Sequence, residues 1–243
     1  TTGVAYYYVT QNGLGTATAE SPANAACREK LQKVLDAAGR YKYANPGVRV
    51  VVKLAAMQSG TDRNVDYMPR RSAVTAGSAE VENPRSYSIM VPRGVEVWGG
   101  YTDAYTSTTN HGFLETNRNV MTNRTTLNGL YQAHGQDVNV YHVVTFTDLT
   151  VDADGKVIEG QTMTDKVSAM GNYNKAVLHG LHITGGMANG VKAEDQRGGA
   201  AIVTDFAHVR NCIVRDNYAA EEGGALYLQP RSLVSGTLLE ANS

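Results

Sequence analysis

The sequence predicts an all-β chain wound as a parallel β-solenoid of about 25 residues per coil, with one helix near its N-terminus. Three observations support this fold class. A Gly-Gly-Ala motif at residues 198–200 recurs at residues 223–225. Glycine supplies 25 of the 243 residues, above the usual share of about 7%. Only one long segment shows helical periodicity, whereas short β-like runs separated by turn residues fill much of the remainder.

The repeat gives the predicted register of the coils. When the sequence is aligned with itself at an offset of 25 residues, residues of similar size or polarity match. The matched pairs are Val209/Val234, Cys212/Thr237, Val214/Leu239 and Asn217/Asn242. An earlier copy, at residues 178–186, aligns with residues 209–217 at an offset of 31. Equivalent strands of a solenoid pair about 4.8 Å apart, so equivalent residues stack. We therefore expect inward columns Leu181/Cys212/Thr237 and Ile183/Val214/Leu239, and an asparagine stack at one corner.

The N-terminal part contains the one helix. Residues 4–9 read as a strand. Ser21 and Pro22 are typical of a helix N-cap and first turn, and an apolar 3.6-residue period follows until Gly39. We expect this helix, 21–39, to cover the N-terminal end of the first coil. The β-branched run at residues 48–54 predicts a buried strand.

The rest of the chain alternates short strands with polar excursions. Residues 58–85 lack a sustained period and indicate a long exposed excursion. The turn residues 152–156 predict a hairpin. We expect one domain, 1–243, divided into an N-terminal part (1–55), coils with long loops (56–174) and regular coils (175–243). Because no cap follows Ser243, we expect a chain truncated at its C-terminus.

The Gly-Gly-Ala motifs, each followed by an apolar-x-x-Asn group ending at Asn217 or Asn242, resemble the repeats of polymorphic outer-membrane-protein-like surface proteins. Val214 and Leu239 stand where that family usually has Phe. The order of motifs along the chain, including residues 95–101 and 125–129, resembles secreted right-handed parallel β-helix proteins of Bacteroidetes-type bacteria, which share the pectate-lyase-like fold. The resemblance implies a right-handed β-helix at the extracellular or outer-membrane surface of a bacterium.

The charge balance excludes some partners. The chain has 22 basic and 23 acidic side chains, so a nucleic acid or anionic membrane is not expected as its main partner. No apolar run reaches the roughly 18 residues of a spanning helix, so no transmembrane segment is expected. Two cysteines, Cys27 and Cys212, supply neither a disulfide framework nor a complete metal site.

Catalytic residues are not identified by the sequence. Polysaccharide lyases and hydrolases on this fold require a tight acidic cluster, and no such string occurs on a predicted strand. His179 and His182 are three residues apart on a strand, which directs them to opposite faces, and His182 should lie on the exposed outer face. We therefore expect no cofactor and no metal, with Ca²⁺ possible only if the chain is an enzyme.

Aromatic side chains are the candidate ligand-binding residues. Aromatic rings stack on sugars, and tyrosine hydroxyls also form hydrogen bonds. Tyrosine is also common on ordinary β surfaces, and that alternative stays open. The candidates lie beside loops that leave one side of the solenoid: Trp98, Tyr101, Tyr105, Tyr131 and Tyr141.

Three functions fit the sequence. The first is a non-catalytic adhesin or glycan-binding module that contacts a polysaccharide or a host glycan. The second is a lyase or hydrolase whose site is assembled from separate coils. The third is a structural or accessory subunit with an outer-membrane protein partner.

Overall fold

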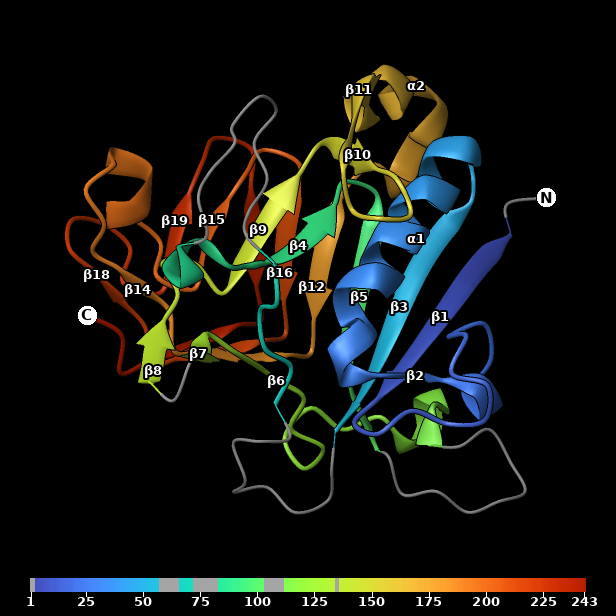
Figure 1. Ribbon diagram of the computed structural model, residues 1–243, viewed down its shortest axis with the longest axis horizontal. Helices are drawn as coiled ribbons and strands as arrows, with labels where there is room; N and C mark the ends of the chain where they lie inside the picture. Colours follow the sequence, from blue (N-terminus) through green and yellow to red (C-terminus); the bar gives the residue numbers. More distant parts are fainter. Residues whose placement is uncertain (1–2, 57–65, 72–82, 103–111, 134–135) are drawn as a thin grey trace.

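The computed structural model describes residues 3–56, 66–71, 83–102, 112–133 and 136–243. The side chains of residues 131–133, 136 and 137 lie outside this description. Within the described residues, most elements are short strands paired in parallel, and helices are few (Figure 1). This composition is compatible with the predicted all-β class.

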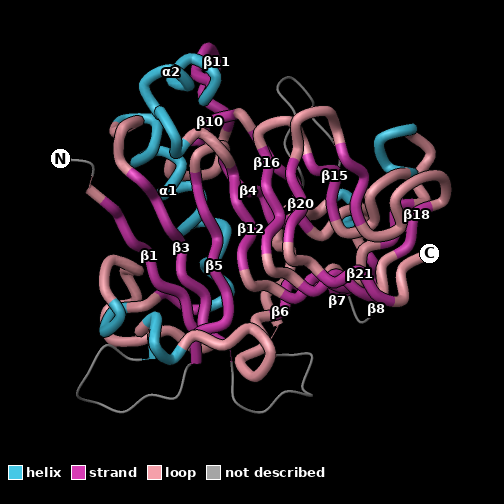
Figure 2. Tube along the Cα trace, turned by 180° about the vertical axis from the view of Figure 1, so that it is seen from behind, coloured by secondary structure: helices cyan, strands magenta, loops and turns pink. Residues whose placement is uncertain are grey.

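The largest sheet in the described part of the chain has seven strands, and its longer strands run side by side in Figure 2. In spatial order the seven strands are β2 (Ala26–Cys27), β1 (Val4–Thr10), β3 (Arg49–Ala56), β5 (Val95–Thr102), β12 (Ala176–His179), β16 (Ala207–Arg210) and β20 (Leu233–Ser235). Alternation along β3 turns Val50, Val52 and Leu54 into the core. The residues between them face outward.

Smaller parallel sheets complete the strand layers of the described residues. The first contains β21 (Leu238–Glu240), β17 (Ile213–Arg215), β13 (His182–Thr184) and β6 (Thr126–Asn128). The second contains β19 (Leu226–Leu228), β15 (Ala201–Val203), β9 (Val144–Thr147) and β4 (Ile89–Pro92). The third pairs β14 (Met187–Ala188) with β18 (Tyr218–Ala219). The apolar core lies between these layers.

From β12 onward the chain visits the sheets in a fixed order and returns to the large sheet at β16 and again at β20. The predicted register is confirmed, because Val209 pairs with Val234 and Val214 with Leu239. The earlier copy is confirmed at its offset of 31, since β12 pairs with β16 and β13 with β17. The side chains of Leu181 and Cys212 are buried in the expected column.

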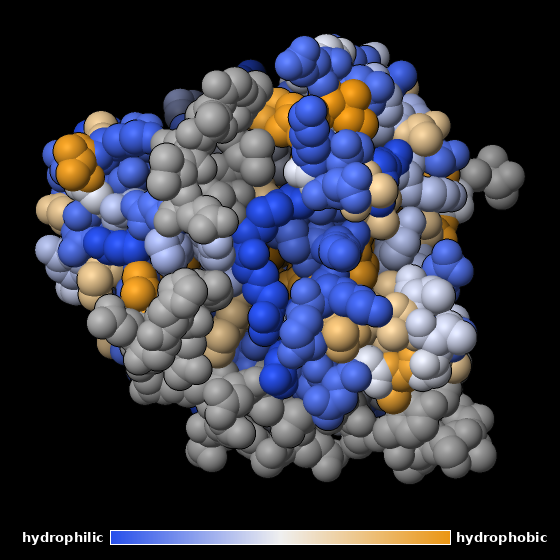
Figure 3. Space-filling view, in the orientation of Figure 1, coloured by the Kyte–Doolittle hydropathy of each residue, from blue (hydrophilic) through white to orange (hydrophobic). Residues whose placement is uncertain are grey.

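The helix α1 (Leu31–Ala44) packs on the inner face of β1, β3 and β5 through Leu31, Val34, Leu35 and Ala38 (Figure 1). The surface over α1 is mostly hydrophilic (Figure 3), as expected when a helix buries one side only. Its predicted limits, 21–39, are wrong at both ends.

The helix begins late because the backbone of Ala26 pairs with Val9 in β2. Only the 3₁₀ turns Pro22–Asn24 and Arg28–Lys30 stand where the N-terminal turns were expected. The helix also continues past Gly39, where a Cβ atom would lie 2.9 Å from Cγ of Pro92. This glycine allows the helix to approach β4 and does not end it.

Two antiparallel hairpins and a short helix project from the layers in the described residues. The predicted hairpin at residues 152–156 is confirmed, because β10 (Leu149–Val151) pairs antiparallel with β11 (Val157–Thr162). In the turn between them, Oδ1 of Asp152 accepts from the backbone N–H groups of Asp154 and Lys156. The second hairpin joins β7 (Leu130–Ala133) and β8 (Gln136–Asn139). The short helix is α2 (Val167–Met170). None of the described helices has the length and apolar character needed to cross a bilayer.

Candidate functional site

The outward face of the seven-stranded sheet carries a row of aromatic and charged side chains. Tyr8, Lys53, Trp98, His179 and Arg210 occupy equivalent positions on five neighbouring strands. Parallel pairing brings such side chains to neighbouring positions about 4.8 Å apart. We call this row and its contacts Tyr6, Arg49, Glu96, Glu115 and Arg118 the Trp98 surface.

Glu96 holds one side of this surface in place. Its carboxylate accepts two hydrogen bonds from Arg49, at 2.7 and 2.8 Å, and one from Nε1 of Trp98 at 2.9 Å. The carboxylate raises the pKa of Arg49 through its hydrogen bonds, so this guanidinium stays charged. The indole ring also contacts guanidinium groups, with Arg49 5.0 Å and Arg118 4.9 Å from its centroid. Trp98 is therefore a fixed, half-buried ring between two cations.

Glu115 holds the other side. It accepts from Nζ of Lys53 and from the hydroxyl of Tyr101, each at 2.7 Å. Burial acts to raise the pKa of Glu115, but these two hydrogen bonds together with the charges of Lys53 and Arg118 outweigh it and lower the pKa. Burial and then Glu115 raise the pKa of Tyr101, so the phenol keeps its proton. Both carboxylates of the Trp98 surface are thus already bonded to donors.

His179 is held as a neutral ring. Burial, followed by the charge of Arg118, lowers its pKa from 6.5 to about 4. Nη2 of Arg118 lies 2.6 Å from Nδ1, and because a guanidinium can only donate, Nδ1 is the acceptor. The proton is therefore on Nε2, which lies 2.8 Å from Nδ2 of Asn211. Because an amide nitrogen also only donates, this second contact is not a hydrogen bond. Arg118 thus occupies the one acceptor nitrogen of the neutral ring.

Arg118 is fixed by three contacts and still offers donors. Nε donates to the carbonyl oxygen of Gly99 at 2.8 Å, and Nη2 donates to Nδ1 and the carbonyl oxygen of His179. Nη1 carries two further N–H groups and has no hydrogen-bond partner among the described residues. The side chain lines an open depression of about 460 Å³, together with Glu115, His179 and Asn211. A preorganised cation thus borders open space.

The remaining sequence candidates lie elsewhere. Tyr101 is fully buried beneath the Trp98 surface. Tyr141 lines a separate cleft on the sheet that contains β9. Tyr105 and the side chain of Tyr131 fall outside the described residues. The structure therefore brings Trp98 and Tyr101 together and leaves Tyr141 apart.

Sequence reasoning missed the cations of this site. Arg118 reaches His179 across 61 positions of sequence, and no local motif marks such a contact. His182 also differs from its prediction, because it is 7% exposed and lies 3.1 Å from the carbonyl oxygen of Val120. It points away from the core as expected, but the segment that carries Val120 covers it. An alignment of residues 95–98 with residues 176–179 could have predicted one contact of this site, since it places Trp98 beside His179.

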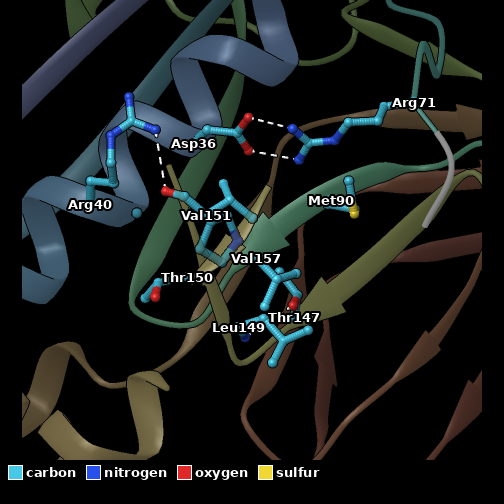
Figure 4. Close-up of a pocket in the computed structure, with 11 residues that line it drawn as sticks. Asp36, Arg40, Arg71, Met90, Thr147, Leu149, Thr150, Val151 and Val157 are labelled. Atoms are coloured by element: carbon cyan, nitrogen blue, oxygen red, sulfur yellow. Dashed lines mark hydrogen bonds and ion pairs between the residues drawn. The ribbon is translucent and has the colours of Figure 1, made fainter. Parts of the chain in front are cut away.

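A smaller cavity beside α1 has a structural role. There Asp36 accepts two hydrogen bonds from Arg71, at 2.6 and 2.9 Å (Figure 4). The cavity measures about 10 Å³, the lower limit of the space that one water needs. The pair ties the segment of Arg71 to the helix and leaves no room for a ligand.

No group of three or more His, Cys, Asp or Glu side chains in the described residues is placed to hold a metal ion. No family model, curated protein or solved structure matches the chain. The geometry of the Trp98 surface therefore carries the functional argument.

Proposed function

We propose that the chain is a right-handed parallel β-helix of a bacterial extracellular or outer-membrane surface protein that binds an acidic polysaccharide without cleaving it. The repeated order of the parallel sheets and the 25-residue register support a β-helix. The Trp98 surface is the binding face.

Arg118 carries the proposal. Its guanidinium is locked by protein contacts, stacks near Trp98, and keeps an amino group without a partner among the described residues beside the 460 Å³ depression. A planar guanidinium suits a carboxylate or sulfate group, and a preorganised one loses little side-chain entropy on binding. Arg210 is exposed on β16, which pairs with the strand of His179, and it adds a second positive charge to the surface. An anionic sugar chain fits this arrangement.

Binding is favoured over catalysis by the state of the acidic groups. General acid and base pairs need carboxyl groups able to give and take protons. Glu96 accepts from Arg49 and from the indole N–H of Trp98, and Glu115 accepts from Lys53 and from the hydroxyl of Tyr101. The acceptor nitrogen of the neutral His179 ring is taken by Arg118. These groups support a rigid recognition surface.

The experiment compares polygalacturonate with its methyl ester, which has the same backbone without the charge. We expect wild-type protein to bind polygalacturonate more tightly, with an affinity that falls as salt screens the charges. Arg118→Gln should weaken binding about fivefold or more, whereas Arg70→Gln, a matched loss of a partly exposed arginine charge, should not.

Three outcomes would contradict this proposal. Equal binding of the ester and the acid would exclude recognition of the charge. Release of reducing ends from polygalacturonate by the wild-type protein would favour the enzyme alternative. Absence of binding to any acidic or neutral polysaccharide would favour a structural or accessory subunit.

A further inference from the structure

A second cavity opens on a different sheet from the Trp98 surface. It has a volume of about 340 Å³ and lies on the outward side of β4, β9 and β15, strands that lie together in Figure 1. We call it the Tyr141 cleft, and the residues that matter to its chemistry are Ser88, Tyr141, His142, Thr145, Ile202 and Thr204. Its volume falls at the lower end of the range for small-molecule sites, about 300–1,000 Å³.

His142 lines this cleft with a ring nitrogen that has no hydrogen-bond partner among the described residues. Its Nδ1 lies 2.9 Å from the carbonyl oxygen of Gly198, and a carbonyl oxygen only accepts, so in the neutral ring Nδ1 carries the proton. Nε2 is then a lone-pair acceptor. That atom is buried and has no hydrogen-bond partner in the described part of the chain. Oδ1 of Asp195 lies 3.9 Å from it, beyond hydrogen-bond distance. Leaving a buried polar atom unpaired is unfavourable, so a donor from outside the protein would be stabilised there.

Thr204 presents a second unpaired group in the same cleft. Its Oγ1 is buried and also lacks a hydrogen-bond partner among the described residues. Nearby, the hydroxyl of Thr145 donates to that of Ser88 at 2.8 Å, so further hydroxyl groups line the wall. The exposed side of Ile202 adds an apolar surface between them. The cleft thus combines hydroxyl groups and an apolar wall with charged side chains of both signs, namely Arg85, Lys192, Glu194 and Asp195.

The wall formed by Tyr141 is fixed before any ligand arrives. The guanidinium of Arg85 lies 4.3 Å from the centre of the Tyr141 ring. Arg85 in turn donates to the carbonyl oxygens of Asn139, at 3.0 Å, and Met187, at 2.8 Å. Because the ring and the cation are held together, little conformational entropy is lost at this wall on binding.

We propose that the Tyr141 cleft binds one uncharged sugar ring. One sugar hydroxyl donates to Nε2 of His142, and a second pairs with Oγ1 of Thr204. A hydroxyl-bearing ring supplies both the donor that His142 requires and the apolar C–H surface that Ile202 and Tyr141 can contact. This site does not depend on the Trp98 surface.

The experiment titrates the protein with the methyl glycosides of glucose, galactose and mannose, followed by calorimetry and by the ¹⁵N signals of the histidine rings. We expect at least one glycoside to bind saturably and to shift the Nε2 signal of His142. Thr204→Val, which removes the hydroxyl at nearly constant shape, should weaken binding about fivefold or more. Thr204→Ser should retain it, and Arg118→Gln should leave it unchanged.

Binding of none of the three glycosides would overturn the proposal and indicate that solvent alone fills the cleft. Equal affinity of the Thr204→Val and wild-type proteins would also overturn it. If Thr204→Val fails to fold, the ¹⁵N shift of His142 in the wild-type protein decides, because a glycoside that binds elsewhere would leave that signal in place. Loss of acidic-polysaccharide binding in Arg118→Gln with glycoside binding intact would separate the two sites.

Discussion

Asn217 and Asn242 stand 25 residues apart and stack, with Nδ2 of Asn217 3.0 Å from Oδ1 of Asn242. The same oxygen accepts from the backbone N–H of Asn217 at 3.1 Å. Asn217 also accepts from the backbone of Gly186 at 3.0 Å and donates to the carbonyl oxygen of Arg215 at 2.8 Å. One side chain therefore joins three segments of the chain, which contain Gly186, Arg215 and Asn242. The predicted asparagine stack is confirmed.

Asn217→Ala should lower the free energy of unfolding by about 3 kcal/mol, because it leaves buried backbone groups unpaired. Urea denaturation measures this change. Asn242→Ala is the matched control, since Asn242 is more exposed, and it should cost about 1 kcal/mol. Both variants lose the bond between the two side chains, so equal losses would show that the further backbone bonds of Asn217 to Gly186 and Arg215 add no stability.

Gly39→Ala should destabilise the protein by about 1–3 kcal/mol, although alanine favours helices, because the new methyl group would press on Pro92. Thermal or urea unfolding measures the effect. Gly47→Ala is the control, since the nearest atom to its added Cβ lies at 4.0 Å. A stabilised Gly39→Ala variant would mean that α1 and β4 are less closely packed than described.

Lys42 is buried in the last turn of α1, and its Nζ donates to the carbonyl oxygens of Pro46 and Val48 at 2.7 and 2.8 Å. Burial lowers its pKa from 10.5 to about 8. Between these pH values the unfolded chain binds more protons than the folded chain, so the free energy of unfolding rises with pH.

The wild-type protein should therefore gain about 3 kcal/mol relative to Lys42→Met between pH 8 and pH 10.5. Subtracting the variant removes the contributions of tyrosines that titrate in the same range. Urea denaturation at several pH values measures the difference. A constant difference across this range would show that Lys42 titrates normally.

The His179 ring should stay neutral down to about pH 4. An NMR titration of its ring signals against pH measures this pKa. Because the unfolded chain takes up this proton near pH 6.5, the folded state loses stability as the pH falls from 6.5 to 4. Arg118→Gln should raise the pKa of His179 towards 6.5 without reaching it, since burial, the larger cause, remains. An unchanged pKa in this variant would remove Arg118 as a cause.

Some features could be predicted from the sequence alone. The 25-residue register was predictable because equivalent residues of a repeat have the same neighbours in the structure, so the same residue type occurs at Val209 and Val234. The turn at Asp152 was readable because its side chain bonds to the backbone within four residues. The limits of α1 were not readable, since the pairing of Ala26 with Val9 overrides a helical pattern.

The sequence by itself determined the repeated strands, their register and the presence of one long helix, because periodicity and turn chemistry are properties of neighbouring residues. Only the tertiary structure decided the two candidate sites. Arg118 meets His179 across 61 positions, and His142 meets Gly198 across 56. Their chemistry depends on burial and on partners that lie far away in the sequence, and neither is set until the sheets have assembled.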